Sequence, residues 1–107
     1  MKLNELTITQ AQEGIRKKDF SSTELVSACL DAIREKDDGI HAYLDVYSDA
    51  LEKAKESDKR VFGMAPEERE NLPPLYGIPV AIKDNILVEG KRCTAGSKML
   101  DTYIASY

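Results

Sequence analysis

Residues Gly77–Ile86 read Gly-Ile-Pro-Val-Ala-Ile-Lys-Asp-Asn-Ile, an apolar run that ends in a lysine and then turns polar. Val80–Ile82 predicts a buried strand, because short apolar runs bounded by such residues are typical of covered strands. Pro79 is tolerated as the first residue of a strand. Lys83 would then lie at the rim of an apolar sheet, although lysine is rarely buried without a partner. Lys83 is therefore the candidate functional residue of the chain.

Lys83 supports two interpretations. Desolvation at the strand end disfavours the charged ammonium, so the lysine would lose its proton near neutral pH and act as a base. Alternatively, the side chain extends past the strand end and keeps its ammonium in water, which spacing alone favours. Asp84 and Asn85 are expected to hold the following turn, because their side chains readily bond nearby backbone groups. The Asp84 side chain is expected to point away from Lys83, because side chains alternate along a strand.

Three helices are predicted before this strand. The first is short and opens with the capping-box spacing of Thr9–Gln12. The second opens with the same spacing at Ser21–Glu24 and extends to about residue 35. A third is predicted over 48–60, capped by Ser48. The second helix has the clearest pattern, since its apolar residues form one stripe: Leu25, Val26, Cys29, Leu30 and Ile33.

The remaining segments are predicted to be extended or irregular. Residues 42–47 are rich in aromatic and aliphatic side chains and predict a strand. Residues 63–74 contain three prolines and an acidic run, which predicts a surface loop, with a disordered linker as the alternative. After Glu89–Gly90 the chain is expected to turn back, and 97–103 predicts a short helix with its apolar residues inward. The predicted fold class is α/β: N-terminal helices followed by the first strands of a mixed sheet, truncated.

Composition narrows the classes of function. A chain of 107 residues supports one domain. Its 19 acidic and 15 basic residues argue against this segment alone binding a phosphate backbone. Cys29, Cys93 and the single histidine, His41, lack the spacing of a metal site. No apolar stretch is long enough for a membrane span or a signal peptide, so a cytoplasmic location is expected.

The run Leu75–Ile86, followed by Gly90 and by Thr94–Leu100, resembles the amidase signature family. Ser21–Val26 and Ala42–Leu44 stand in the order shown by one branch of that family. This branch comprises the A subunits of glutamyl-tRNA(Gln) or aspartyl-tRNA(Asn) amidotransferases. The resemblance extends over essentially the whole chain and is most specific in the first of these runs.

The resemblance implies that Lys83 is catalytic, as one of three catalytic groups in the family. The other two are serines, one of them after a cis peptide bond, and both are expected downstream of Tyr107. Residues 1–107 would thus be the N-terminal portion of a single amidase-type domain, with the lysine but neither serine. The implied reaction is hydrolysis of glutamine, which releases ammonia for amidation of misacylated Glu-tRNA(Gln). Residues 1–107 alone are expected to be inactive.

The resemblance also implies partners. These are the B and C subunits of the amidotransferase, with glutamine in the complete site and tRNA bound through the complex and not through this segment. No cofactor is expected in this chain, because the partner subunit uses ATP and magnesium. An incomplete sheet would expose an unpaired edge, which favours self-association. Two alternatives remain open: a non-catalytic binding or interaction module with the same fold, and part of another amidase signature hydrolase.

Overall fold

The computed structural model describes residues 2–107, which divide into two compact units. The first unit comprises the chain up to Ile40 together with Ser48–Pro79. The second comprises His41–Tyr47 and Val80–Tyr107. Lys83 belongs to the second unit, whereas most of the helical structure belongs to the first. The assignment of residues 1–107 to one larger domain stays a prediction.

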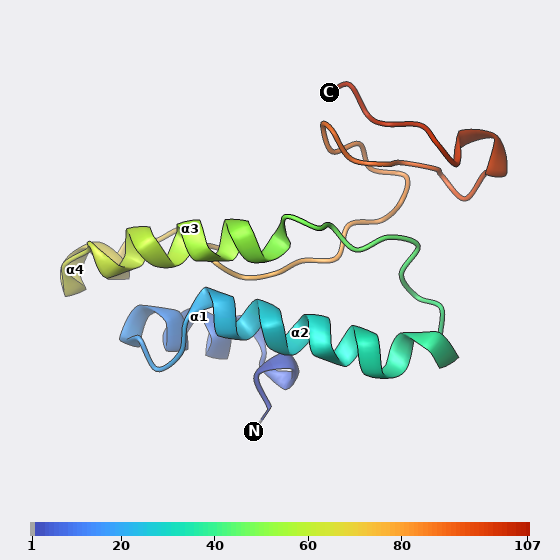
Figure 1. Ribbon diagram of the computed structural model, residues 1–107. Coiled ribbons are helices and arrows are strands. Elements are labelled where there is room, and N and C mark those ends of the chain that lie inside the picture. Colours follow the sequence, from blue (N-terminus) through green and yellow to red (C-terminus); the bar gives the residue numbers. More distant parts are fainter. Residues whose placement is uncertain (1) are drawn as a thin grey trace. The chain divides into compact units, whose positions relative to one another are not determined.

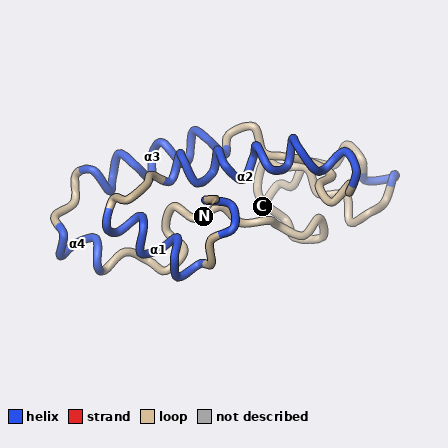
Figure 2. The backbone as a smooth tube through the Cα atoms, turned by 90° about the horizontal axis from the view of Figure 1, so that it is seen from below, coloured by secondary structure: helices blue, strands red, loops and turns tan. Residues whose placement is uncertain are grey.

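Helices account for the regular structure of the first unit. In chain order they are η1 (Leu3–Glu5), α1 (Ile8–Lys17), α2 (Ser22–Lys36), η2 (Asp37–Gly39), α3 (Ala50–Phe62) and α4 (Pro66–Glu70). The second unit contains one short 3-10 helix, η3 (Lys98–Leu100). Within residues 2–107 no segment forms a strand, and Figure 2 shows only helices and loops.

Helix α1 begins earlier than predicted. The capping box uses Thr7 and Gln10: the Gln10 N–H donates to Thr7 Oγ1 (3.2 Å), and the Thr7 N–H donates to Gln10 Oε1 (2.9 Å). The predicted pair Thr9–Gln12 has the same spacing, so the local motif is ambiguous. The earlier start adds two residues to the helix and still directs Ala11 into the core, where it is buried.

Helix α2 begins as predicted. The Ser21 N–H donates to Glu24 Oε2 (2.7 Å) and the Glu24 N–H donates to Ser21 Oγ (3.1 Å), which completes the capping box. Along the predicted apolar stripe, Leu25 and Val26 are buried, while the residues nearer the C-terminus, Cys29, Leu30 and Ile33, are only partly buried. The stripe is therefore covered mainly in its first turn.

Helices α2 and α3 lie side by side and run in opposite directions (Figure 1). Asp58 of α3 reaches the first turn of α2, where its carboxylate accepts hydrogen bonds from the N–H groups of Ser22 (2.7 Å) and Thr23 (3.0 Å). Helix α3 starts at Ala50 with Asp49 as N-cap, two residues after the predicted start. The pairing of α2 with α3 thus includes hydrogen bonds from a side chain of one helix to the backbone of the other.

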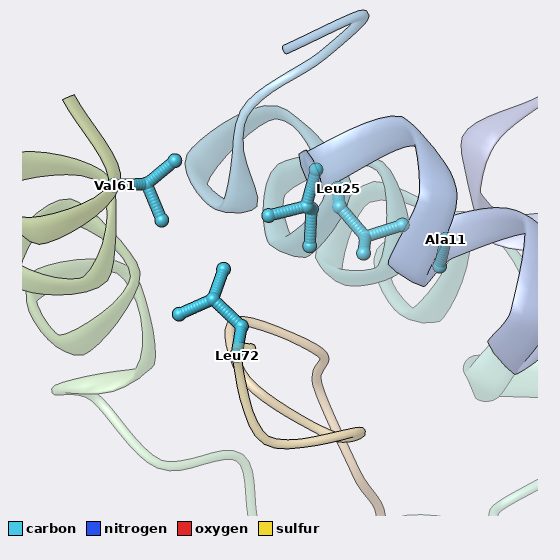
Figure 3. Close-up of a cluster of buried hydrophobic side chains, with 5 residues drawn as sticks. Ala11, Leu25, Val61 and Leu72 are labelled. Carbon is cyan, nitrogen blue, oxygen red and sulfur yellow. The ribbon is translucent and has the colours of Figure 1, made fainter. Parts of the chain in front are cut away.

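The core of the first unit gathers residues from three helices and a loop. Ala11 and Ile15 come from α1, Leu25 from α2, Val61 from α3 and Leu72 from the segment after α4. Figure 3 shows Val61 and Leu72 pointing toward Leu25. Burial of each such side chain removes apolar surface from water and stabilises the fold by about 1.5–3 kcal/mol for a leucine or valine.

Gly14 of α1 lies against the ring of Phe20. A Cβ atom at Gly14 would lie 2.1 Å from Phe20 Cε1, and Phe20 packs on the core. In an open helix, alanine in place of glycine stabilises by about 1 kcal/mol. At this position the ring would have to move, so glycine is required by packing and not by backbone conformation.

We expect Gly14→Ala to destabilise the chain by about 1–2 kcal/mol, because the cost of overpacking exceeds the gain in helix propensity. Urea unfolding followed by circular dichroism measures the change. Gly39→Ala is the matched control, since a Cβ there meets nothing within 4 Å. A Gly14→Ala chain as stable as the Gly39→Ala chain would show that Phe20 moves aside at no cost.

The start of the Gly77–Ile86 run is tied to α2. Ser22 Oγ donates to the Gly77 carbonyl oxygen (2.6 Å), and the Ser22 side chain is buried, with 2% of the residue exposed. Gly77 has φ +74°, and an added Cβ would lie 3.3 Å from both Ile15 Cδ1 and the Ser22 side chain. Positive φ and this close approach both favour glycine here.

The segment 63–74, predicted as a surface loop, is not wholly irregular. It contains α4, which begins at Pro66, and its Leu72 is buried. The prediction of an irregular segment was wrong at 66–70, because a proline that cannot continue α3 can still occupy the first position of a new helix, where it loses no intrahelical hydrogen bond. Arg69 of α4 donates to the carbonyl oxygens of Arg16 (2.7 Å) and Met64 (3.0 Å), which anchors α4.

The strands predicted at 42–47 and 80–82 are absent from the described structure. Val80 is 61% exposed and Ile82 is 41% exposed, so the expectation of a buried strand at these residues was wrong for this structure. A strand needs a hydrogen-bonded neighbour, and an isolated extended segment gains little in water. The truncated α/β sheet as a fold class stays a prediction.

The predicted helix over 97–103 is reduced to η3, and its apolar residues do not face inward. Met99 is 94% exposed and Leu100 is also exposed. Ser97 caps η3 by accepting a hydrogen bond from the Met99 N–H (3.2 Å). Only three residues join the helix, because an isolated turn with no covered face has little to stabilise it.

Candidate functional site

Lys83 lies in the second unit, and its side chain is exposed. Its carbonyl oxygen accepts a hydrogen bond from the Ile86 N–H (2.9 Å), which closes a turn directly after the lysine. The predicted turn at Asp84–Asn85 is confirmed by this bond. Lys83 is therefore the first residue of this turn.

Asp84 connects this turn to a second loop. Its carboxylate accepts hydrogen bonds from the Thr94 N–H (3.0 Å to Oδ1) and from the Thr94 hydroxyl, through Oδ2. Its carbonyl oxygen accepts from the Ala95 N–H (2.9 Å) and from the Cys93 thiol (3.2 Å). The expectation that the Asp84 side chain bonds a nearby backbone group was wrong, because its backbone partner, the Thr94 N–H, lies ten residues downstream and not in the adjacent turn.

These hydrogen bonds hold Asp84 in its ionised form. They lower the pKa of its carboxyl group below the usual value, chiefly through the hydrogen bond from the Thr94 hydroxyl and then through that from the Thr94 N–H. Because the ionised form accepts these bonds, they are present at neutral pH and weaken only as the pH falls through the lowered pKa.

The loop that receives Asp84 has an unusual backbone. Ala95 has φ +50° and Gly96 has φ +72°, and the Ser97 N–H donates to the Thr94 carbonyl oxygen (2.9 Å). Two successive residues with positive φ are found in type I′ turns, where glycine or asparagine is usual and alanine is not. The turn is held in this form because its first residue, Thr94, is buried and bound to Asp84.

Arg92 holds the other side of the second unit. Its guanidinium donates to the Leu44 carbonyl oxygen (3.0 Å) and to Asp101 Oδ1 (2.8 Å), and Asp45 Oδ2 lies 3.9 Å from its Nε. Arg92 thus joins segment 41–47 to the later part of the chain. Lys91 adds a cation–π contact with the Tyr47 ring, 4.8 Å from its centroid.

The predicted turn at Glu89–Gly90 is confirmed. Gly90 has φ +79°, and the Lys91 N–H donates to the Val88 carbonyl oxygen (3.0 Å). The chain then returns so that Arg92 and Ile104 form an isolated antiparallel bridge. Two backbone hydrogen bonds flank the bridge: the Gly90 N–H donates to the Ala105 carbonyl oxygen, and the Cys93 N–H donates to the Tyr103 carbonyl oxygen. The paired segment is too short to count as a strand.

The structure thus places the one predicted site residue, Lys83, directly before a polar network that sequence reasoning found only in part. Thr94 had no predicted role, and no periodic pattern links it to Asp84. Among residues 2–107, no group of three or more histidine, cysteine or acidic side chains could hold a metal ion. None of the helices in this range combines the length and apolar character needed to cross a membrane.

Comparisons with known proteins give a consistent result. A family model described as Amidase matches residues 24–107. The A subunit of a glutamyl-tRNA(Gln) amidotransferase from Brachyspira hyodysenteriae is 41% identical over 111 residues, covering 100% of this chain and 22% of the relative. The A subunit of the same name from Xanthobacter autotrophicus is 44% identical, covering 99% of this chain and 20% of the relative.

A third relative of the same name, from Natranaerobius thermophilus, is 41% identical and is covered over 21% of its length. The chain therefore spans about a fifth of the length of the curated relatives it matches. No solved structure is significantly similar to the chain.

Proposed function

Since this chain belongs to the amidase family, we propose that it is the N-terminal part of the A subunit of a glutamine-hydrolysing amidotransferase. The observation that carries this proposal is the similarity to glutamyl-tRNA(Gln) amidotransferase A subunits, which extends over 98–100% of the chain in the first five relatives. In this proposal the whole protein hydrolyses glutamine and supplies ammonia for the amidation of misacylated Glu-tRNA(Gln).

Lys83 is the catalytic base of this proposal. A serine hydroxyl attacks the side-chain amide of glutamine only when a base takes its proton. Lys83 accepts that proton through the second serine and returns it to the amide nitrogen, which leaves as ammonia when the C–N bond breaks. Water then hydrolyses the acyl-enzyme, which releases glutamate and restores the serine hydroxyl. What supports this role is the match to the amidase family, which includes Lys83.

The neighbouring carboxylate supports the same assignment. An ionised carboxylate that paired with Lys83 would favour the charged ammonium and oppose its role as a base. Asp84 instead directs its carboxylate at Thr94. Asp84 is therefore not assigned a proton-transfer role.

The proposal includes the assembly around the site. The B and C subunits bind this A subunit, tRNA contacts the complex outside this segment, and ATP and magnesium serve the partner subunit. The complex works in the cytoplasm. In the complete protein, the rest of the chain provides neighbouring strands, and residues 42–47 and 80–82 then form strands. The complete protein therefore has an α/β fold in this proposal.

Ammonia release tests the proposal directly. The full-length protein, purified with its partner subunits, is incubated with glutamine, and ammonia is measured against a blank without protein. Release of ammonia that depends on glutamine supports the proposal. A pure, folded complex that releases none from glutamine but hydrolyses another amide would assign the protein to another branch of amidase signature hydrolases.

A polypeptide limited to residues 1–107 is expected to release no ammonia from glutamine above the blank. The resemblance assigns both catalytic serines to later positions, so this polypeptide has a base but no nucleophile. The measurement is the same ammonia assay at high protein concentration. Turnover that disappears in Lys83→Ala would contradict the division of catalytic groups proposed here.

A second candidate function rests on the exposure of Lys83. A non-catalytic binding or interaction module is expected to have an exposed lysine at this position. In that case, substitution of Lys83 in the full-length protein would leave ammonia release unchanged, which separates the two candidates.

A further inference from the structure

We propose that Asp84 and Thr94 form a positioning pair that fixes the backbone carrying Lys83. This inference rests on the proposed function, in which Lys83 is the base. It assigns roles to two residues that touch neither the substrate nor the reacting atoms in that function. The pair acts by holding the turn after Lys83 in one arrangement.

Several hydrogen bonds converge on Asp84. Its side chain is held by Thr94 through two hydrogen bonds, and its carbonyl oxygen is held by Ala95 and Cys93. Asp84 is covalently joined to Lys83, and the carbonyl oxygen of Lys83 is held by Ile86. The peptide on the C-terminal side of the lysine is therefore fixed at successive backbone groups.

Thr94 is buried, and its hydroxyl is fully hydrogen-bonded. Thr94 and Cys93 are each 5% exposed, although Ala95 and Gly96 directly after them are exposed. The Thr94 hydroxyl oxygen accepts a hydrogen bond from the Gly96 N–H (3.2 Å). Its hydrogen is then free for Asp84, which as an ionised carboxylate only accepts. The buried Thr94 hydroxyl thus has a partner both as a donor and as an acceptor, which fixes its position.

The turn that follows Thr94 has a strained backbone. Ala95 adopts positive φ (+50°), a conformation that L-amino acids with a Cβ rarely adopt because it is unfavourable for them. This conformation brings the Ala95 N–H to the carbonyl oxygen of Asp84. Strain that persists only because neighbouring bonds enforce it is found where a protein holds functional groups in place.

The expected consequence is a loss of rate without a loss of binding. A displacement of about 1 Å in a catalytic group lowers the rate by about 10²-fold. Thr94→Val keeps the shape of the side chain but removes the hydroxyl donor. We expect it to lower kcat for ammonia release by about 10- to 100-fold while KM for glutamine changes less than about 3-fold.

The experiment uses the full-length protein with its partner subunits. Thr94→Val is compared with Thr94→Ser, which retains the hydroxyl and is expected to restore kcat to within about 3-fold of wild type. Ser97→Ala is the matched control, because it removes a hydroxyl from the same loop. The Ser97 hydroxyl bonds the Met99 N–H and not Asp84. The kcat of Ser97→Ala is expected to equal that of wild type.

A second readout does not depend on activity. Without glutamine, acetic anhydride is added in limiting amount, and mass spectrometry gives the acetylation rate of Lys83 relative to the exposed Lys98. We expect this ratio to change at least about 3-fold in Thr94→Val and to return in Thr94→Ser, since reactivity follows the environment of the amine. Ser97→Ala is expected to leave the ratio unchanged.

Two results would overturn the positioning pair. One is a Thr94→Val protein with the kcat and the acetylation ratio of wild type. The other is equal loss in Thr94→Val and Thr94→Ser, which would assign Thr94 a steric role. Should Thr94→Val not fold, Asp84→Asn replaces it, since the amide loses one of the two acceptor oxygens, and unchanged kcat and acetylation in that variant would refute the pair.

The two hypotheses fail in different ways. If the wild-type complex releases no ammonia from glutamine, the proposed function is wrong, whatever the acetylation ratios are. If the wild-type complex is active but the acetylation ratio and kcat ignore Thr94, the positioning pair is wrong and the proposed function stands.

Discussion

Replacement of Lys83 by alanine in the full-length protein is expected to lower kcat for ammonia release from glutamine by about 10²–10⁴-fold, the range associated with loss of general acid–base catalysis. The physical reason is that a serine hydroxyl keeps its proton at neutral pH when no base accepts it. Ammonia release under saturating glutamine measures the effect. Binding of glutamine and of the partner subunits is expected to remain.

The stability of Lys83→Ala is expected to match that of wild type within about 0.5 kcal/mol, because exposed side chains away from special features contribute little. Lys98→Ala is the control: this lysine is also exposed, and it lies in η3 of the same unit. A well-folded Lys83→Ala protein with the activity of the Lys98→Ala protein would favour the non-catalytic module over the amidotransferase.

The helices of the first unit could be predicted where their signals are local. The capping box at Ser21–Glu24 and the apolar residues that follow it lie within a few residues of one another, so α2 begins where the sequence predicts. The same motif occurs twice near α1, at Thr7 and at Thr9, and the sequence offers no local reason to choose. Ala11 and Ile15 lie inside the helix and in the core for either start, so their burial does not choose between the two caps.

Strand predictions failed for the opposite reason. The residues 42–47 and 80–82 have the composition of strands, but composition does not supply a neighbour. In the second unit, segment 41–47 is held in part by the Arg92 guanidinium and by the contact of Lys91 with the Tyr47 ring, and it forms no strand. Local preference for an extended backbone was therefore not enough to make a sheet.

The candidate site shows the same division. Lys83 could be found from the sequence because an apolar run ends at it. Asp84 was expected to bond nearby backbone, but its backbone partner, Thr94, lies ten residues downstream and could not be identified from the sequence. That contact depends on a turn in which Ala95 has positive φ, and alanine carries no signal for such a turn. A network closed by an unfavourable backbone conformation is invisible to residue preferences.

Asp58→Ala is expected to destabilise the chain by about 2–4 kcal/mol, since hydrogen bonds to charged groups contribute about 1.5–3 kcal/mol each and water replaces part of them. The first three N–H groups of α2 have side-chain partners: Ser21 Oγ serves Glu24, and the Asp58 carboxylate serves Ser22 and Thr23. The Thr23 hydroxyl also donates to Asp58 Oδ2 (2.5 Å).

The loss is large because Asp58 acts on α2 from another helix. Its negative charge lies at the N-terminus of α2, where the helix dipole favours an anion. The carboxylate also links α2 to α3, so the variant loses a helix cap and a tertiary contact together. Ser22 is buried, which limits how well water can replace the missing acceptor.

Urea unfolding of the chain, followed by circular dichroism, measures the difference, and Asp31→Ala is the matched control. Asp31 also lies on α2 and pairs with Arg34 (2.5 Å), but both side chains are about two-thirds exposed, so its loss is expected to cost less than about 0.5 kcal/mol. Equal stabilities of Asp58→Ala and Asp31→Ala would mean that solvent caps α2 as well as the carboxylate does. The antiparallel packing of α2 and α3 would then depend on apolar contacts alone, in the core that contains Leu25 of α2 and Val61 of α3.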